Sequence, residues 1–209
     1  MGFDLTEDEL QTPARAAARE LRGKRVFALV MSGVVPDLDG LELVGEGAEA
    51  VLVGGCDETV EPNQVFRYMN LARAFAEIQL GAELYCLHKN RWWQTSRGPL
   101  LDAGAFVAGL EYATGVDAVV LGKPSPSYFA AALDALDAEP ELTWLVTDDV
   151  DADVRGARLF GMKTALVRTG KFRPEALESA DTTPDIVVSS LAHFPALLEE
   201  DLTGGGWAP

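Results

Sequence analysis

Short apolar runs alternate along this chain with longer segments whose apolar residues recur at helical spacing. The runs are rich in β-branched residues and predict strands, while the longer segments predict helices. The predicted strands cover residues 25–31, 50–53, 83–87, 118–121, 142–146, 164–167 and 185–188. Strands that alternate with helices are typical of an α/β fold with a largely parallel sheet, which we therefore expect here.

Capping residues mark where the predicted helices begin. Thr12 predicts an N-cap in front of Pro13, and Gly23 ends that helix. Asn63 predicts the cap of a second helix, in which apolar residues recur as far as Ile78. Two more helices are expected, from Ser125 or Ser127 to Leu136 and from about Asp151 to Phe160.

Composition narrows the class of protein. The 209 residues suffice for one large domain or for a core with an inserted cap, and 48% hydrophobic residues are typical of a folded globular protein. The net charge of −16 argues against nucleic acid or an anionic membrane surface as the main partner. An anionic substrate would then need local positive charge from a lysine, a metal ion or a helix N-terminus.

The start of the chain and its two cysteines favour a cytoplasmic location. The chain opens with an acidic stretch instead of a signal peptide, and no uninterrupted apolar run approaches membrane-spanning length. Cys56 and Cys86 lack the pattern of a disulfide framework or a zinc site, and we interpret them as small core residues. We expect a cytoplasmic protein that has no membrane partner.

Lys123 follows the predicted strand 118–121 and precedes a helix. Gly122 permits a close backbone approach, and a helix N-terminus beside a strand end favours anions. The simpler alternative is a surface turn with a solvated lysine. We prefer contact between Lys123 and a phosphate group, because carboxylates follow the next strand.

The predicted strand 142–146 runs into an acidic segment that contains Asp148, Asp149 and Asp153. Ligands gather at the carboxyl ends of strands in doubly wound sheets, and carboxylates there can hold a Mg²⁺ ion that neutralises phosphate oxygens. In the alternative interpretation, Asp151 and Asp153 only cap a helix and offset its dipole. The upstream Gly-Lys-Pro favours the metal site.

These motifs together resemble the haloacid dehalogenase superfamily, and within it subclass IIA, which includes p-nitrophenyl phosphatases and phosphoglycolate phosphatases. The resemblance covers essentially the whole chain up to about Leu198 and rests on residues 121–126, 147–157, 161–162 and 169–172, with further similarity at 88–93 and 102–113. It implies a partial Rossmann-like haloacid dehalogenase core, residues 1–23 and 116–209, with a large inserted α/β cap, residues 24–115.

The resemblance also implies a function, that of a Mg²⁺-dependent phosphomonoester hydrolase acting on a small phosphorylated metabolite. Lys123 would be the catalytic lysine that holds the phosphoryl group, while Asp148 ligates Mg²⁺ with support from Asp153 and Asp149. Thr147 replaces the glycine that the family usually has before the metal aspartate. The cap would close over the site and pair with a second cap in a homodimer.

The cap offers candidate substrate-binding residues. Gly55 and Asp57 belong to a glycine-containing loop after a predicted strand, and Asn90 lies beside His88 after the next strand. Structural roles are an equal alternative, because glycines form turns, buried histidines are satisfied by neighbours, and aromatic residues pack.

The family's nucleophile motif, Asp-x-Asp at the end of the first strand, is not found at the expected place. Its first aspartate forms an aspartyl-phosphate, and its second acts as general acid and base. Residues 12–17 resemble the stretch that follows this motif, so we expect weak or absent turnover, from a misassigned start or true degeneration. The alternative function is a non-catalytic phosphometabolite-binding or assembly protein of the same fold.

One Asp-x-Asp-Gly sequence, which begins at Asp37, is a competing candidate for the nucleophile. Pro36 would interrupt a central strand there, and we interpret the segment as a cap loop. The missing first strand would flank the strand 142–146. Without it, that strand is left on an open edge, and we expect the chain to aggregate, pair with a second copy or repack.

Overall fold

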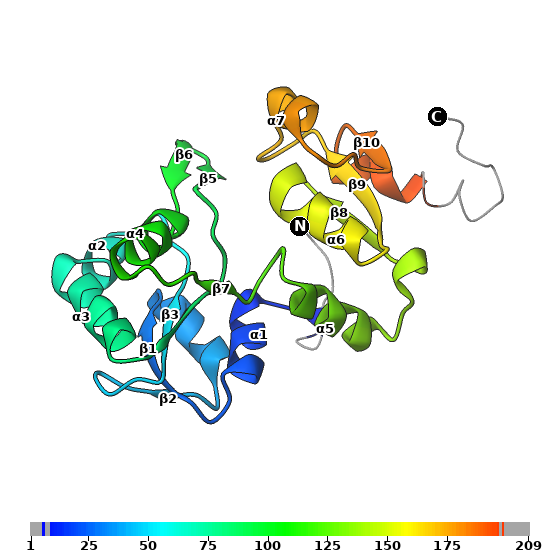
Figure 1. Ribbon diagram of the computed structural model, residues 1–209. Helices are drawn as coiled ribbons and strands as arrows, with labels where there is room; N and C mark the ends of the chain where they lie inside the picture. Colours follow the sequence, from blue (N-terminus) through cyan, green and yellow to red (C-terminus); the bar gives the residue numbers. More distant parts are fainter. Residues whose placement is uncertain (1–5, 7–8, 197, 199–209) are drawn as a thin grey trace. The chain divides into compact units, whose positions relative to one another are not determined.

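The computed structural model describes residues 6, 9–196 and 198, and it divides the chain into two compact units, Met1–Ala135 and Leu136–Pro209 (Figure 1). Each unit has its own parallel sheet, so the predicted α/β class is confirmed. The predicted division into a core and an inserted cap is a separate matter and stays a prediction. No helix in the described part of the chain is both long and apolar enough to cross a membrane.

The first unit is built on a five-stranded sheet in the order β2-β1-β3-β4-β7, and all its neighbouring strands are parallel. A separate antiparallel hairpin pairs β5 with β6. The strands are β1 (Arg25–Leu29), β2 (Glu42–Leu43), β3 (Ala50–Val53), β4 (Glu83–Cys86), β5 (Trp92–Thr95), β6 (Gly98–Leu101) and β7 (Val119–Val120).

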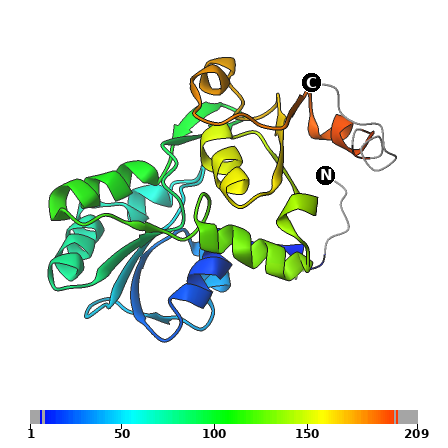
Figure 2. The ribbon, with the colours of Figure 1, turned by 45° about the vertical axis from the view of Figure 1, so that its right-hand side comes forward.

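Helices cover both faces of this sheet (Figures 1 and 2). They are α1 (Pro13–Glu20), the 3₁₀ helix η2 (Ser32–Leu38), α2 (Pro62–Val65), α3 (Tyr68–Gln79) and α4 (Gly104–Thr114). A further helix, α5 (Pro126–Leu136), follows β7 and ends at the boundary between the two units. Alternate side chains of β3 serve two cores, since Val51 packs with α3 and α4 while Leu52 packs with α1. Burial on both faces explains why β3 is wholly apolar.

The second unit contains a three-stranded parallel sheet in the order β10-β9-β8. Its elements are the 3₁₀ helix η3 (Pro140–Leu142), β8 (Trp144–Thr147), the π-helical turn η4 (Val150–Val154), α6 (Arg155–Leu159), β9 (Lys163–Val167), α7 (Pro174–Ser179), β10 (Ile186–Val188) and the 3₁₀ helix η5 (Leu191–His193). The residues of β9 are almost all buried, whereas most of β8 is half-buried because β8 lies at the sheet edge.

The predicted strands all occur, and the limits of β3 agree with the prediction. The Thr12 cap is also confirmed, because the Thr12 hydroxyl accepts a hydrogen bond from the N–H of Arg15 at 3.1 Å. The Asn63 cap is wrong, since Asn63 lies inside α2 and the predicted helix is broken into α2 and α3. The Asn70 side chain donates to the carbonyls of Gln64 and Val65, which stabilises this break.

Candidate functional site

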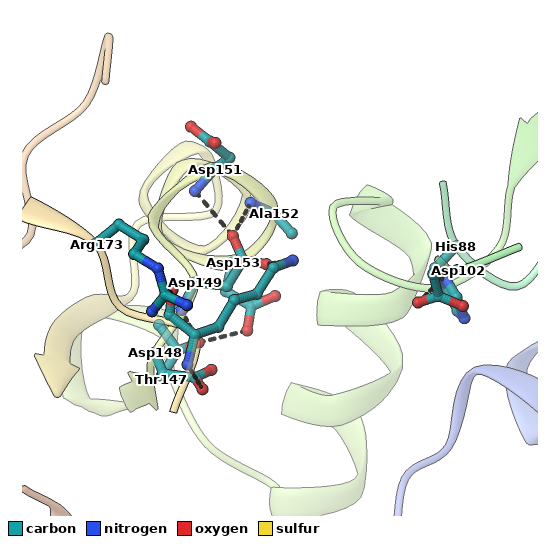
Figure 3. Close-up of polar contacts among 10 residues, drawn as sticks. His88, Asp102, Thr147, Asp148, Asp149, Asp151, Ala152, Asp153 and Arg173 are labelled. Atoms are coloured by element: carbon teal, nitrogen blue, oxygen red, sulfur yellow. Dashed lines mark hydrogen bonds and ion pairs between the residues drawn. The ribbon is translucent and has the colours of Figure 1, made fainter. Parts of the chain in front are cut away.

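The acidic segment after β8 is organised as the cap of η4 (Figure 3). Oδ1 of Asp149 accepts hydrogen bonds from the N–H groups of Asp151 and Ala152, at 3.1 and 3.0 Å. The capping residue is therefore Asp149, and neither Asp151 nor Asp153 has this role.

Thr147 connects the end of β8 to the first turn of η4. Its hydroxyl donates to Oδ2 of the buried Asp153 at 2.5 Å and accepts from the N–H of Asp149 at 3.1 Å. A glycine at this position would make neither contact. Thr147 therefore fixes the Asp153 carboxylate at the carboxyl end of β8.

The carboxylate of Asp148 contacts the loop that follows β9. Oδ2 of Asp148 accepts a hydrogen bond from the backbone N–H of Lys171 at 2.8 Å. Gly170 has a φ of +62°, and a Cβ atom there would lie 2.1 Å from the same oxygen. Only glycine fits this position without displacing Asp148.

Asp149 also forms an ion pair with Lys171, whose Nζ lies 2.6 Å from Oδ2 of Asp149. Burial raises the pKa of Asp149, but hydrogen bonds from Lys171 and from two backbone N–H groups more than offset it and leave the pKa below its usual range. Both carboxylate oxygens of Asp149 are thus engaged, in the helix cap and in the ion pair.

The donor set is compatible with Mg²⁺. In the described residues, no three His, Cys, Asp or Glu side chains lie close enough together to hold a metal ion. Mg²⁺, however, prefers oxygen ligands and is often held by one or two carboxylates together with waters and substrate phosphates. Asp148 and Asp153 fit that requirement, whereas the two oxygens of Asp149 have other partners.

Lys123 lies in the first unit, where it follows β7 at the carboxyl edge of the five-stranded sheet. The ladder between β4 and β7 continues to Gly122, whose N–H donates to the carbonyl of Leu87 at 3.0 Å. A Cβ atom on Gly122 would lie 2.3 Å from that carbonyl oxygen. Lys123 is half-buried and precedes α5, as the sequence predicts.

The same sheet edge carries the candidate residues that follow β3 and β4. Asp102 is buried, and its Oδ1 accepts from the N–H of Cys56 at 3.3 Å while its Oδ2 lies 3.7 Å from Nδ1 of His88 (Figure 3). A Cβ atom on Gly55 would lie 3.0 Å from Nε2 of His88. Asp102 therefore ties both loops together. The sequence indicated no role for it, because its partners come from distant segments.

Two other predicted substrate-binding residues have structural contacts. Oδ1 of Asp57 accepts hydrogen bonds from the N–H and the hydroxyl of Thr59, at 2.9 and 2.6 Å, and closes a turn. The backbone carbonyl of Asn90 accepts from the N–H of Gly104 at 3.0 Å, at the start of α4. Contact of Asp57 or Asn90 with a substrate stays a prediction.

Neither cysteine has the properties of a nucleophile. Burial raises the pKa of Cys56 to about 11 and that of Cys86 to about 12. The reactive thiolate is therefore scarce at neutral pH. Both thiols are free and pack against the first unit's core, in agreement with the predicted core role.

Asp37 lies in η2 rather than at the end of a strand. Its Oδ2 accepts a hydrogen bond from the hydroxyl of Thr12 at 2.8 Å, and its Oδ1 lies 3.5 Å from Nε of Arg15. Asp37 thereby connects η2 to the start of α1. Asp37 thus lies outside any strand, as predicted, but in a 3₁₀ helix instead of a loop.

Comparison with known proteins adds independent findings. A HAD-hydrolase-like family model matches residues 120–194. The phospholysine phosphohistidine inorganic pyrophosphate phosphatase of Xenopus laevis is 36% identical over 202 residues, which are 94% of this chain and 72% of the relative. The p-nitrophenyl phosphatase of Archaeoglobus fulgidus has a TM-score of 0.81 and 28% identity, over 94% of this chain and 77% of that structure.

A third relative was crystallised with a metal ion. The glycerol phosphate phosphatase of Mycobacterium tuberculosis, in complex with magnesium, has a TM-score of 0.75 and 28% identity, over 89% of this chain and 57% of that structure. All three relatives are phosphatases by name. The chain belongs to the haloacid dehalogenase superfamily, among the p-nitrophenyl phosphatase-like proteins of subclass IIA.

Proposed function

We propose that this protein is a Mg²⁺-dependent phosphomonoester hydrolase for a small phosphorylated metabolite. The observation that carries the proposal is the arrangement at the end of β8, where Lys171 holds Asp148 and Thr147 holds Asp153. Such oriented carboxylates suit a hard cation, and the chain's relatives include a phosphatase in complex with magnesium.

In this proposal Asp148 and Asp153 hold Mg²⁺, which supplies positive charge to the phosphate oxygens. Lys123 holds the phosphoryl group as the catalytic lysine, while Gly55, Asp57 and Asn90 contribute to the substrate side. Since the net charge is −16, these local positive charges have to offset the repulsion of an anionic substrate.

The predicted core and cap complete the proposal. Residues 1–23 and 116–209 belong to the phosphatase core, and residues 24–115 form a cap that selects the substrate and pairs with a second cap in a homodimer. The cytoplasm is the proposed location, since phosphorylated metabolites are found there.

We propose weak or absent turnover for these 209 residues by themselves. Their one Asp-x-Asp-Gly sequence begins at Asp37, which is engaged with Thr12 and Arg15 in η2. The same observation favours a second candidate function, in which the protein binds a phosphorylated metabolite or assembles with a partner without hydrolysing a bond.

Hydrolysis of p-nitrophenyl phosphate with and without Mg²⁺ separates these functions. The purified chain is compared with Lys123→Ala, Asp148→Asn and Asp37→Asn. Asp151→Asn is the matched control, because it removes a charge from the same segment at an exposed position. Activity that is lost in the Lys123 and Asp148 variants but kept in the control supports the hydrolase.

The remaining outcomes are equally informative. Loss of Mg²⁺-dependent activity in Asp37→Asn would identify Asp37 as the nucleophile and contradict the proposed weak turnover. Activity that is equal in every variant would come from a contaminating phosphatase and would overturn the hydrolase. Thermal stabilisation by inorganic phosphate with Mg²⁺, without turnover, supports the binding function.

A further inference from the structure

The loop that follows β9 contacts the acidic segment in two places, through the backbone N–H and the side chain of Lys171. We propose that Gly170 and Lys171 are positioning residues, which hold Asp148 in the orientation that binds Mg²⁺. This inference rests on the proposed Mg²⁺ site and assigns to that site two residues that do not touch the ion.

Gly170, which has no side chain, leaves room for the Asp148 carboxylate. Its hypothetical Cβ would lie 2.1 Å from Oδ2 of Asp148, which is closer than two such atoms can approach, and 3.1 Å from Cγ, which is a tight contact. Any side chain at position 170 therefore has to displace the carboxylate. The φ of +62° adds a second reason for glycine, because most other residues are strained in this region.

The backbone N–H of Lys171 orients the Asp148 carboxylate. It donates to Oδ2 of Asp148 at 2.8 Å, and in the described residues Oδ1 of Asp148 accepts no hydrogen bond. One oxygen is thus held by the protein, and the other is available to a cation. A fixed carboxylate binds a metal more tightly because less rotational freedom is lost on binding.

The side chain of Lys171 fixes the loop itself. Its Nζ lies 2.6 Å from Oδ2 of Asp149, and the two side chains are only 22% and 14% exposed. Asp149 in turn caps η4, so that the loop, Asp148 and the helix start form one hydrogen-bonded unit. The Asp149 carboxylate thereby positions the site instead of serving as a ligand.

Another glycine offers a matched control. Gly161, in the same unit, also has a positive φ, +86°, but a Cβ atom there would lie 3.7 Å from its nearest neighbours, in ordinary contact. Gly161→Ala therefore imposes comparable backbone strain without touching Asp148. Gly170→Asn is a second variant, because asparagine tolerates positive φ but still carries a Cβ.

Isothermal titration with Mg²⁺ alone tests the proposal on the folded 209-residue chain, with circular dichroism to verify folding. We expect Gly170→Ala and Gly170→Asn to bind Mg²⁺ about 10–100-fold more weakly, the usual effect of removing support from a metal ligand. Gly161→Ala should bind like the unmodified chain.

The outcomes separate this inference from the proposed function. Unchanged Mg²⁺ affinity in either folded Gly170 variant would overturn the positioning role while the metal site survives. An equal loss of affinity in Gly161→Ala would also overturn it, because strain alone would then explain the effect. If the unmodified chain binds no Mg²⁺, the proposed metal site itself fails.

Discussion

At the residue scale, buried carboxylates in this chain accept hydrogen bonds from backbone N–H groups that are distant in sequence. Glu77 accepts from Gly47 and Ala48, which lie 30 and 29 positions away. Asp102 accepts from Cys56, which lies 46 positions away. Each carboxylate fixes a loop, and residue spacing cannot predict such contacts because they arise only when strands assemble side by side.

Asp185 gives a prediction of how the stability of the fold depends on pH. Burial raises its pKa, but hydrogen bonds from the N–H and hydroxyl of Thr164 and from Arg158 more than offset this and leave the pKa below its usual range. A carboxyl group whose pKa is lower in the folded state stabilises the fold above its unfolded pKa, about 3.9 for aspartate. That stability is lost as the pH falls through the folded pKa.

We therefore expect Asp185→Asn to reduce the free energy of unfolding at pH 7 and to flatten its decline below about pH 4. Urea unfolding at a series of pH values measures both effects. Asp134→Asn, at an exposed position of α5, is the control and should follow the unmodified chain. A parallel acid dependence in Asp185→Asn and the unmodified chain would contradict this account.

At the element scale, the sequence predicted strand limits best where both faces of a strand are buried. β3 is buried on both faces, so its apolar run ends where the strand ends. The two-residue strand β2 and the hairpin of β5 and β6 were not predicted, because short strands with exposed or half-buried residues leave little apolar signal. One predicted helix is two helices in the structure, and local hydrogen bonds from the Asn70 side chain to the carbonyls of Gln64 and Val65 stabilise the break between them.

In the candidate site, too, some features could be predicted from the sequence and others could not. The places of Lys123 and Asp148, each after a strand, could be predicted from the sequence because a motif and the end of an apolar run mark them, while their roles stay predictions. The contacts of Asp148 with Gly170 and Lys171 were not predicted, although residues 169–172 had been recognised as similar to the family. A glycine whose role is to leave space for a side chain has no signal in a single sequence.

The cap of α1 gives a prediction at this scale. The hydroxyl of Thr12 accepts from the N–H of Arg15 and donates to Asp37 of η2. We expect Thr12→Ala to lower the free energy of unfolding by about 1 kcal/mol in urea, the typical cost of losing an N-cap. Thr12→Ser retains the hydroxyl and should recover most of the loss, whereas equal losses in both variants would exclude the cap as the cause.

At the scale of the whole molecule, two features have opposite effects on self-association: an open strand edge favours it, and the high net charge disfavours it. Among the described strands, β8 pairs only with β9, and three of its four residues are half-buried apolar side chains. Such edges favour pairing between copies, while a net charge of −16 keeps copies apart.

Salt should therefore promote self-association, because it screens the repulsion between like charges. Light scattering after size-exclusion chromatography should show a mass that rises with protein and salt concentration. Leu145→Lys in β8 should suppress this rise, whereas Leu159→Lys, which adds the same charge at an exposed position of the helix α6, should leave it unchanged. A monomer at every concentration and salt would contradict the prediction.

The most direct test of the central claim, that the carboxyl end of β8 is a Mg²⁺ site for phosphoryl chemistry, is calorimetric titration of the chain with Mg²⁺ in the presence of inorganic phosphate. We predict saturable binding of Mg²⁺ that Asp148→Asn abolishes and Asp151→Asn retains. Equal binding by the unmodified chain and Asp148→Asn, or no binding by the unmodified chain, would contradict the claim.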